Sequence, residues 1–488
     1  MQPDEDMITI ETLRKLFEKS ADISFQEYMF NGQKIDFIIC EAMVDQQMLH
    51  GVVVKRVQEF CETMELEKGQ SATNILEYLH VPGLQQVTEK SEIISLVYTG
   101  NVILCFSESN IILSSNIANK PNRKPEETKL ESAVKGPRDN FIEDVATNIA
   151  IIRKRLPTNS LCVEKFTLGK RSKTTVALLY FDDIADKKTL STLQQRLGEV
   201  DTDIVFSADV LMEMVEKSPL LLPLHDLTGR PDSAVEALAR GRFIIFVDGS
   251  SYGVITPMNI GLPLKTGEDT EYPIITSSFE RLLRYAGLLI GGMLPAFWLA
   301  LTTYHQNQLP LQLLATVVES GIGLPFPAVI EMLLMIFMFE LFREAGLRLP
   351  SVIGGTISVV GGLIIGDAAI NAGITSPAMI VVIASSTIAT FTLVNQSLVT
   401  AVSVIRLFFI AFTAFFGLFG FFIAFFFVLT SLAKIRIYDV PYLNFTADLS
   451  LSNISKTFLR LTPAQYNKRP KMLKPTDETR AKEADRES

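Results

Sequence analysis

The sequence predicts an α/β soluble module of two related subdomains, followed by an α-helical membrane domain with several spans. The first 280 or so residues mix charged and apolar side chains as soluble proteins do, whereas 285–433 are almost continuously apolar and precede a basic tail. Apolar runs of about 18 or more residues are typical of membrane spans, because a helix satisfies its own backbone in lipid. Within the soluble part, strand-like segments repeat at one spacing.

Composition narrows the class of protein. The chain has 488 residues, which is enough for two or three domains, and its net charge of −9 argues against nucleic acid as a partner. The residues after Met1 are acidic and do not resemble a signal peptide, so we expect the N-terminal module to stay in the cytoplasm. The cysteines have no paired spacing, which predicts reduced, buried thiols at Cys40, Cys61, Cys105 and Cys162.

Changes in composition also indicate the domain boundaries. The polar, proline-bearing stretch 120–127 predicts a linker, 119–129, between a first subdomain, 1–118, and a second, 130–275. The membrane domain is predicted at 276–433, with four to six apolar segments, and a basic cytoplasmic tail at 434–488.

The two soluble subdomains resemble each other. Phe37–Asp45 resembles Leu178–Asp186, and Gly100–Phe106 resembles Gly241–Val247, both at a separation of 141 residues. Two matches in one register predict a duplicated α/β unit, although apolar strands can also align by chance. The periodicity predicts helices at 47–59 and 190–200 and strands at 102–106 and 243–247.

The sequence contains no catalytic motif. There is no Walker loop, H-E-x-x-H, G-x-S-x-G or G-x-G-x-x-G, and the four histidines lack metal-ligand spacing. We therefore expect no enzyme activity, no cofactor and no metal. The acids Asp182, Asp183 and Asp186 are interpreted as a solvated loop, with a divalent-cation site as the alternative.

The apolar half is predicted to span the membrane an even number of times. Apolar segments lie at 285–304, 324–342, 351–366, 377–394 and 402–432. Arginines before the first segment, and none just after it, orient that segment from the cytoplasm outward. Since the basic tail also favours the cytoplasm, we predict four crossings, with 309–318 and part of 377–400 re-entrant.

One glycine-rich segment is a candidate pore helix. Gly355, Val359, Gly362 and Gly366 share one helical face, and small faces let helices approach closely in lipid. The alternative is close packing inside one subunit. A helix that packs against copies of itself would form an apolar constriction that gates by dewetting. The pore-lining or pore-packing candidates are Gly355, Val359, Val360, Gly362, Leu363 and Gly366.

Ionisable residues at membrane depth form a second candidate set, because charges there are costly and tend to face a cavity or a partner. They are Glu319, Glu331, Glu340, Asp367 and Arg406. Glu331 is the first choice for an ion-path or inter-subunit group. Glu340 is expected to pair at the interface with Arg343 or Arg348, and Arg406 to snorkel to headgroups or meet one of the acids.

Several motifs resemble the A subunits of GerA-type spore germinant receptors over roughly residues 130–445. They are Gly136–Phe141, Thr147–Arg155, Gly229–Asp232, Leu238–Arg242, Val247–Ser250, Leu324–Pro327, Arg343–Pro350, Ile357–Gly366 and Pro441–Leu443. The family pattern is not followed at Asp139-Asn140, at Gly229 and at Ser320-Gly321.

The resemblance implies a multi-pass protein of the spore inner membrane. Such A subunits act with a permease-like B subunit and a lipoprotein C subunit. The family is associated with release of monovalent cations, and its A subunits are thought to oligomerise as a channel. We therefore expect a homo-oligomer that forms through both the membrane domain and the soluble domains. The lipid bilayer is expected as a further partner.

The first of these motifs suggests a coupling segment. A helix predicted at 140–156 has acids in its first turn and arginines in its last, an order that complements the helix dipole. We hypothesise that Arg138 pairs with an acid of the neighbouring subdomain or subunit; the alternative is a local cap. The coupling candidates are Gly136, Pro137, Arg138, Asp139, Phe141, Asn148 and Arg153.

The leading functional prediction is a ligand-gated ion channel subunit in a receptor complex. The alternatives are a non-conducting signalling scaffold of that complex and a paralogous spore membrane channel outside a nutrient receptor. A secondary transporter ranks last, because the apolar half shows no internal repeat.

Overall fold

The computed structural model describes residues 8–63, 72–107, 109, 111–119, 139–216, 222–348, 366–443, 451–462, 465–466 and 468–480. The chain divides into two compact units. The sheet unit comprises 1–218, 225–257 and 466–488, and the helical unit comprises 219–224 and 258–465.

The first subdomain of the sheet unit is a five-stranded antiparallel sheet in the order β1-β2-β4-β5-β3. A π-helical turn, Leu49–Val53, joins α2 to α3. The elements are α1 (Ile10–Leu16), β1 (Ile23–Phe30), β2 (Gln33–Cys40), α2 (Gln46–Met48), α3 (Val54–Thr63), α4 (Ala72–Tyr78), β3 (Gln85–Gln86), α5 (Lys90–Tyr98), β4 (Asn101–Phe106) and β5 (Ile111–Asn116).

Both faces of this sheet are buried under helices. Alternate residues of a strand point to opposite faces, so Phe37 packs on one face with the α3 residue Phe60, and Ile38 packs on the other with the α5 residue Val97. The two faces therefore form two separate apolar cores, and β2 and β4 read as nearly continuous apolar runs because both of their faces are covered.

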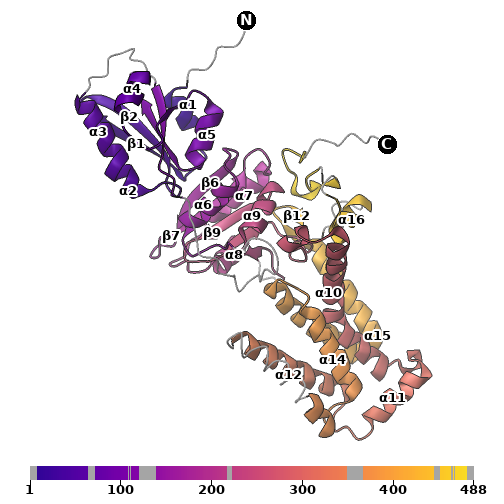
Figure 1. The fold of residues 1–488 in the computed structure, drawn as a ribbon. Coiled ribbons are helices and arrows are strands. Elements are labelled where there is room, and N and C mark those ends of the chain that lie inside the picture. The colour runs from indigo at the N-terminus through magenta and orange to yellow at the C-terminus, as the bar shows by residue number, and fades with distance from the viewer. Residues whose placement is uncertain are drawn as a thin grey trace. The chain divides into compact units, whose positions relative to one another are not determined.

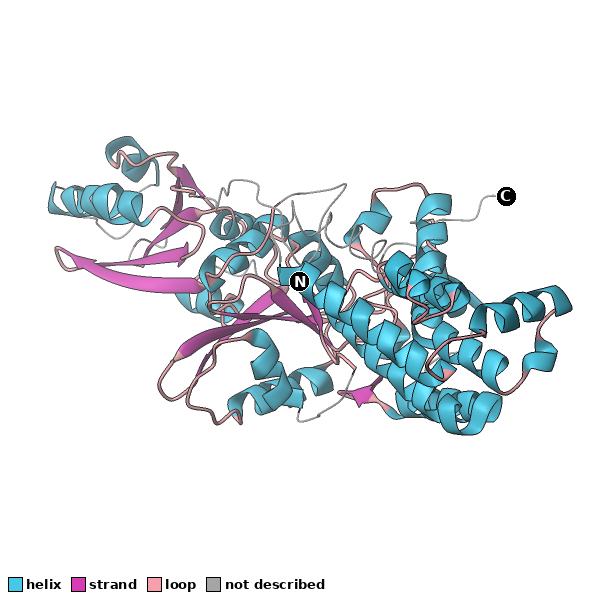
Figure 2. Ribbon diagram, turned by 90° about the horizontal axis from the view of Figure 1, so that it is seen from below, coloured by secondary structure: helices cyan, strands magenta, loops and turns pink. Residues whose placement is uncertain are grey.

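The second subdomain repeats the topology of the first, with sheet order β6-β7-β9-β10-β8. Figures 1 and 2 show strands with helices packed beside them in this half of the chain. The duplication predicted from the sequence is confirmed: β3 and β8 begin 141 residues apart, at Gln85 and Asp226. The elements are α6 (Val145–Arg155), β6 (Leu161–Leu168), β7 (Thr174–Phe181), α7 (Lys187–Gly198), α8 (Ala208–Glu216), β8 (Asp226–Thr228), α9 (Pro231–Ala239), β9 (Phe243–Val247) and β10 (Gly253–Thr256).

Two local signals recur at equivalent places in the subdomains. Asp45 and Asp186 each cap the helix that follows the second strand, by accepting hydrogen bonds from backbone amides of its first turn. Gly100 and Gly241 each precede the fourth strand with φ of 95° and 90°, a left-handed conformation that favours glycine. Asp186 of the predicted acidic cluster is thus a helix cap, and Asp182 is paired with Lys19 and Lys187.

Part of the C-terminal tail packs on the second subdomain. The Thr476 amide donates to the Ile184 carbonyl at 2.9 Å, and the Arg469 Nε donates to the Ala239 carbonyl at 3.0 Å. Leu473 is buried. The sequence predicts only a basic tail here, because the acceptors of these bonds are backbone carbonyls, which composition does not reveal.

The helical unit contains two helices, among the described residues, that are long and apolar enough to cross a membrane: α10 and α15. Its main elements are α10 (Ile274–Thr303), α11 (Leu311–Gly321), α12 (Ala328–Arg348), α14 (Pro377–Thr390), α15 (Gln396–Lys434), β11 (Arg436–Ile437), β12 (Val440–Pro441) and α16 (Leu451–Phe458).

The last apolar stretch, identified in the sequence as a single segment at 402–432, folds back on itself at Gly417. That glycine has φ 58° and ψ −139°, a region that glycine alone occupies readily. A straight helix would hold Phe408 and Phe427 roughly 28 Å apart. Their ring centroids are only 5.6 Å apart. Residues 396–416 and 418–434 are therefore two antiparallel arms, so this stretch begins and ends at the same face of the helical unit.

The packing of α10 sets the direction of its neighbours. The Ser386 hydroxyl of α14 donates to the Gly291 carbonyl at 2.9 Å, and Thr392 lies against Gly287, so α14 runs antiparallel to α10. Tyr304, which follows α10, donates to the Ala414 carbonyl and covers Gly417. The first arm of α15 therefore runs parallel to α10, and its second arm returns.

Close helix packing on small residues occurs along α10. A Cβ at Gly287 would lie 2.5 Å from the Ala389 carbonyl oxygen, and one at Gly291 would lie 2.6 Å from the Thr390 Cγ2. At such distances a larger residue would require its neighbours to shift, so small residues are favoured where these helices meet. Of the predicted pore segment, residues 351–365 lie outside the described residues, and Gly366 is buried at the start of a short helix before α14.

Candidate functional site

A buried ion pair joins the two subdomains of the sheet unit. Arg153, in the last turn of α6, is 0% exposed. Its Nε and Nη2 donate to the two carboxylate oxygens of Asp22 at 2.8 and 2.9 Å. The guanidinium carbon lies 4.1 Å from the centroid of the Tyr98 ring. Ser20, Asp22, Tyr98 and Arg153 form what we call the interface cluster.

The electrostatics of the interface cluster hold Arg153 charged. Burial by itself lowers the pKa of Arg153, but the adjacent Asp22 carboxylate raises it above its ordinary value overall. Backbone hydrogen bonds support the same junction: the Ala21 amide donates to the Val163 carbonyl at 2.9 Å, and the Val163 amide to the Lys19 carbonyl at 3.1 Å. Residues 19–21 of the first subdomain thereby pair in parallel alongside the edge strand β6.

The other described coupling candidates lie around the start of α6. Phe141 packs edge-on against Phe246 at 4.7 Å, and the Asn148 side chain bonds both the amide and the carbonyl of Ile142. Asp139 is paired with Arg155 at 2.6 Å. These contacts hold 139–144 out of the helix, so α6 begins at Val145 and not at 140. Gly136, Pro137 and Arg138 lie outside the described residues.

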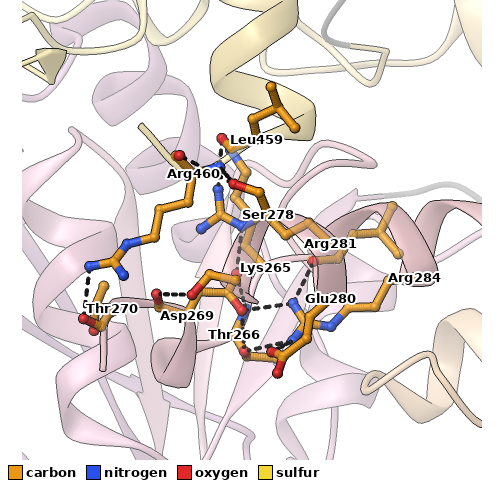
Figure 3. A network of polar contacts seen from close by, with 12 residues as sticks. Lys265, Thr266, Asp269, Thr270, Ser278, Glu280, Arg281, Arg284, Leu459 and Arg460 are labelled. Atoms are coloured by element: carbon orange, nitrogen blue, oxygen red, sulfur yellow. Dashed lines mark hydrogen bonds and ion pairs between the residues drawn. The ribbon is translucent and has the colours of Figure 1, made fainter. Parts of the chain in front are cut away.

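A second buried network lies at the start of α10 (Figure 3). Asp269 is 0% exposed and accepts hydrogen bonds from the Arg281 Nε at 2.6 Å and the Arg284 Nη1 at 2.9 Å. Burial raises the pKa of Asp269, but the two guanidiniums outweigh it and lower that pKa below its usual value. We call these three residues the Asp269 network.

Residues 459–460, which follow α16, also make hydrogen bonds to this network and to the residue after Asp269. Arg281 also donates to the Leu459 carbonyl at 3.3 Å, and Arg460 donates to the Thr270 carbonyl at 2.9 Å. Sequence reasoning assigned Arg281 and Arg284 only to orienting the first span and did not single out Asp269. The available signal was an acid 12 and 15 residues before two arginines at the start of an apolar helix.

Three charged side chains meet inside the helical unit. Glu340 of α12 lies between Arg343, whose Nη2 is 2.6 Å from its Oε2, and Arg406 of α15, whose Nη2 is 2.5 Å from its Oε1. Arg343 Nη1 donates to the Ser403 hydroxyl at 2.8 Å, and Arg406 Nη1 to that of Ser386 at 3.4 Å. We call Glu340, Arg343 and Arg406 the α12 cluster.

The remaining predicted acids are not brought together. Glu331 is buried near the start of α12, where its Oε1 accepts hydrogen bonds from Thr375 at 2.7 Å and from the Ser376 amide at 2.7 Å. Its described partners are thus hydroxyl and amide donors just before α14. Glu319 and Asp367 are exposed, and Asp367 accepts a bond from Asn371 at 3.0 Å.

Comparison with known proteins places this geometry in a family. Residues 11–472 match the model of the Bacillus/Clostridium GerA spore germination protein family. The chain belongs to the GerA family of spore germination proteins. The resemblance identified from the sequence motifs is therefore confirmed, and the GerA family is not known as a class of enzymes.

Individual GerA relatives are similar over most of their length. The chain is 37% identical to spore germination protein XA of Bacillus anthracis over 476 residues, which cover 96% of each protein. It is 30% identical to the uncharacterized membrane protein YfkQ of Bacillus subtilis, over 94% of this chain and 90% of the relative.

One solved structure is similar to part of the chain. The crystal structure of the N-terminal domain of the A subunit of the Bacillus megaterium spore germinant receptor GerK3 aligns with a TM-score of 0.39 and 23% identity. The alignment covers 51% of this chain and 94% of that domain.

Proposed function

We propose that this GerA-family chain is the A subunit of a nutrient germinant receptor in the spore inner membrane. It acts with a permease-like B subunit and a lipoprotein C subunit. In this proposal, the helical units of several copies assemble into a ligand-gated channel that releases monovalent cations at the start of germination.

The observation that carries the channel proposal is the charge buried on α12. Glu331 and the α12 cluster lie among the apolar helices α12, α14 and α15, and ionisable groups at membrane depth are costly and tend to mark functional sites. In the sequence, α12 leads directly into the predicted pore segment 351–366, which carries the constriction candidates Val359, Val360 and Leu363.

The proposed topology has the sheet unit and the C-terminal tail in the cytoplasm. It is supported by Arg281 and Arg284 at the start of α10, which favour that end inside, and by the fold-back at Gly417, which returns the chain after α15 to the starting face. An even number of crossings follows from this arrangement.

Coupling is proposed to run through the segment Gly136–Phe141 and the interface cluster. Arg153 fixes the two subdomains to each other through Asp22, so a movement imposed on one is passed to the other as a rigid displacement. The Asp269 network holds the start of α10 in the same manner.

Potassium efflux tests the channel. The protein is expressed with its B and C partners in growing bacteria, and efflux and membrane potential are compared for wild type, Val359→Ala, Val360→Ala and Leu363→Ala. Val381→Ala, on an exposed position of α14, is the matched control. We expect at least one constriction variant, and not the control, to depolarise the cells. Silence of all three, with normal expression and assembly, would instead favour the signalling scaffold.

A further inference from the structure

The α12 cluster carries more positive than negative charge. One carboxylate, Glu340, is shared by two guanidiniums, Arg343 and Arg406. Among the described residues no second acid lies within ion-pair distance of either guanidinium, and residues 349–365, which follow α12, include no aspartate or glutamate. The cluster thus has a net charge of about +1 in apolar surroundings, where an uncompensated charge is strongly unfavourable.

The deeper arginine also has an unused donor. Arg406 is 2% exposed, and its buried Nε has no hydrogen-bond partner among the described residues. Its other nitrogens are used by Glu340 and Ser386. A buried polar group without a partner costs free energy, so Arg406 is incompletely satisfied. The unbalanced charge of the cluster is what indicates a missing anionic group.

The cluster is open on the α12 side. The side chains of Glu340 and Arg343 are 28% and 17% exposed, whereas that of Arg406 is 2% exposed. An anion can therefore reach Arg343 from outside the helical unit. The planar fork of an arginine binds phosphate oxygens in pairs, which a compact cation cannot do.

The position along α12 favours a lipid headgroup. The helix ends five residues after Arg343, at Arg348, whose side chain is 80% exposed, as expected near a membrane surface. Phe337 and Leu341 are 60% and 48% exposed and lie one turn apart on α12, and Phe337 lies one turn before Glu340. The exposed apolar side of α12 for acyl chains is thus separated from Arg343 by Glu340, the carboxylate with which Arg343 pairs.

We propose that the α12 cluster is a binding site for the phosphate of an anionic phospholipid in the cytoplasmic leaflet. Arg343 contacts the phosphate directly, and Arg406, held by Glu340, supplies the balancing positive charge behind it. This inference rests on the membrane placement proposed above, but it does not require that the chain conducts ions.

Lipid-dependent thermal stability tests the site. The purified full chain is titrated in detergent with phosphatidylglycerol, phosphatidylcholine or inorganic phosphate, and Tm is followed by the fluorescence of Trp298, the only tryptophan. A ligand that binds only the folded state raises Tm. We expect phosphatidylglycerol alone to raise Tm, by a few degrees, in wild type and in the control variant Arg348→Gln. Arg348 is a suitable control because it pairs with Glu344, outside the α12 cluster.

Two variants at the proposed contact decide the outcome. Arg343→Gln should lose at least half of the rise in Tm caused by phosphatidylglycerol. Arg343→Lys keeps the positive charge but lacks the planar guanidinium, so its rise in Tm should lie between those of Arg343→Gln and wild type. A full shift in both variants overturns the proposal, as does an equal shift with phosphatidylcholine. An equal shift with inorganic phosphate overturns the lipid assignment.

The test also distinguishes a bound lipid from a carboxylate of a neighbouring subunit. It further keeps failure of the lipid site distinct from failure of the channel proposal. If wild type is an oligomer in phosphatidylcholine that Arg343→Gln dissociates, a carboxylate of a neighbouring subunit occupies the site and the lipid is excluded. Because Tm involves no ion flux, a negative lipid result leaves the channel proposal standing. Silence of all three constriction variants in the efflux experiment leaves the lipid site standing.

Discussion

Arg153 and Arg406 are each almost completely buried, and each is paired with a carboxylate from a distant part of the chain. Arg153 has both oxygens of Asp22 to itself, whereas Arg406 shares Glu340 with Arg343. The first pair is balanced and closed; the second is unbalanced and partly open. Buried arginines therefore have different roles in the two clusters. Arg153 is structural, whereas the α12 cluster, as we propose, binds a ligand.

At the residue scale we predict that Arg153→Gln loosens the subdomain interface. Removing one partner of a buried ion pair leaves the other charge unpaired, at a cost of about 3 kcal/mol or more. Hydrogen exchange of the full chain should show the protection of α6 amides reduced about 100-fold. The control is Arg171→Gln, because Arg171 pairs with Asp203 while 80% exposed and should matter little. Equal protection in the two variants would contradict the structural role.

The elements of the sheet unit are largely predictable from local pattern. The strand predicted at 243–247 is β9 itself, because a short apolar run between a glycine and a turn admits few alternatives. The fold-back in α15 was not predictable in this way. Gly417 lies in a phenylalanine-rich stretch whose hydropathy is the same for one long helix and for two arms, and only its backbone conformation distinguishes them.

At the element scale we predict that Gly417→Ala destabilises the helical unit. The required backbone conformation costs a non-glycine residue about 1–3 kcal/mol. The new Cβ would also lie 2.8 Å from the Tyr304 ring. Thermal unfolding followed by Trp298 should shift down by several degrees. Gly321→Ala, which meets no atom within 4 Å, should leave Tm nearly unchanged. A Tm unchanged by Gly417→Ala would argue for a straight helix.

At the scale of the whole molecule, the fold class and the GerA family could be inferred from the sequence, but which charges pair over long sequence separations could not. The partner of Arg153 is 131 residues away, and periodicity carries no information on contacts over that range. Glu340 was expected to meet Arg343, one helical turn away, and does so. Arg406 reaches Glu340 from a helix 66 residues further along.

The proposed topology predicts the labelling of two engineered cysteines. Burial raises the pKa of the native thiols, to about 11 for Cys61 and Cys162 and about 12 for Cys105, and also raises that of Cys40. Native thiols should therefore stay unreactive toward a membrane-impermeant maleimide at neutral pH. In intact cells, Asn307→Cys, in the exposed turn after α10, should be labelled, and Lys468→Cys only after permeabilisation. Labelling of Lys468→Cys in intact cells would place the tail outside.

The buried pair between Asp22 and Arg153 also bears on how the chain is made. Asp22 leaves the ribosome 131 residues before its partner. At bacterial rates of synthesis this is a delay of roughly ten seconds. During that time the first subdomain carries an exposed carboxylate, an uncovered Tyr98 ring and no β6 strand to receive Ala21. Although the two subdomains share one topology, the first therefore completes its folding only when the second has emerged from the ribosome.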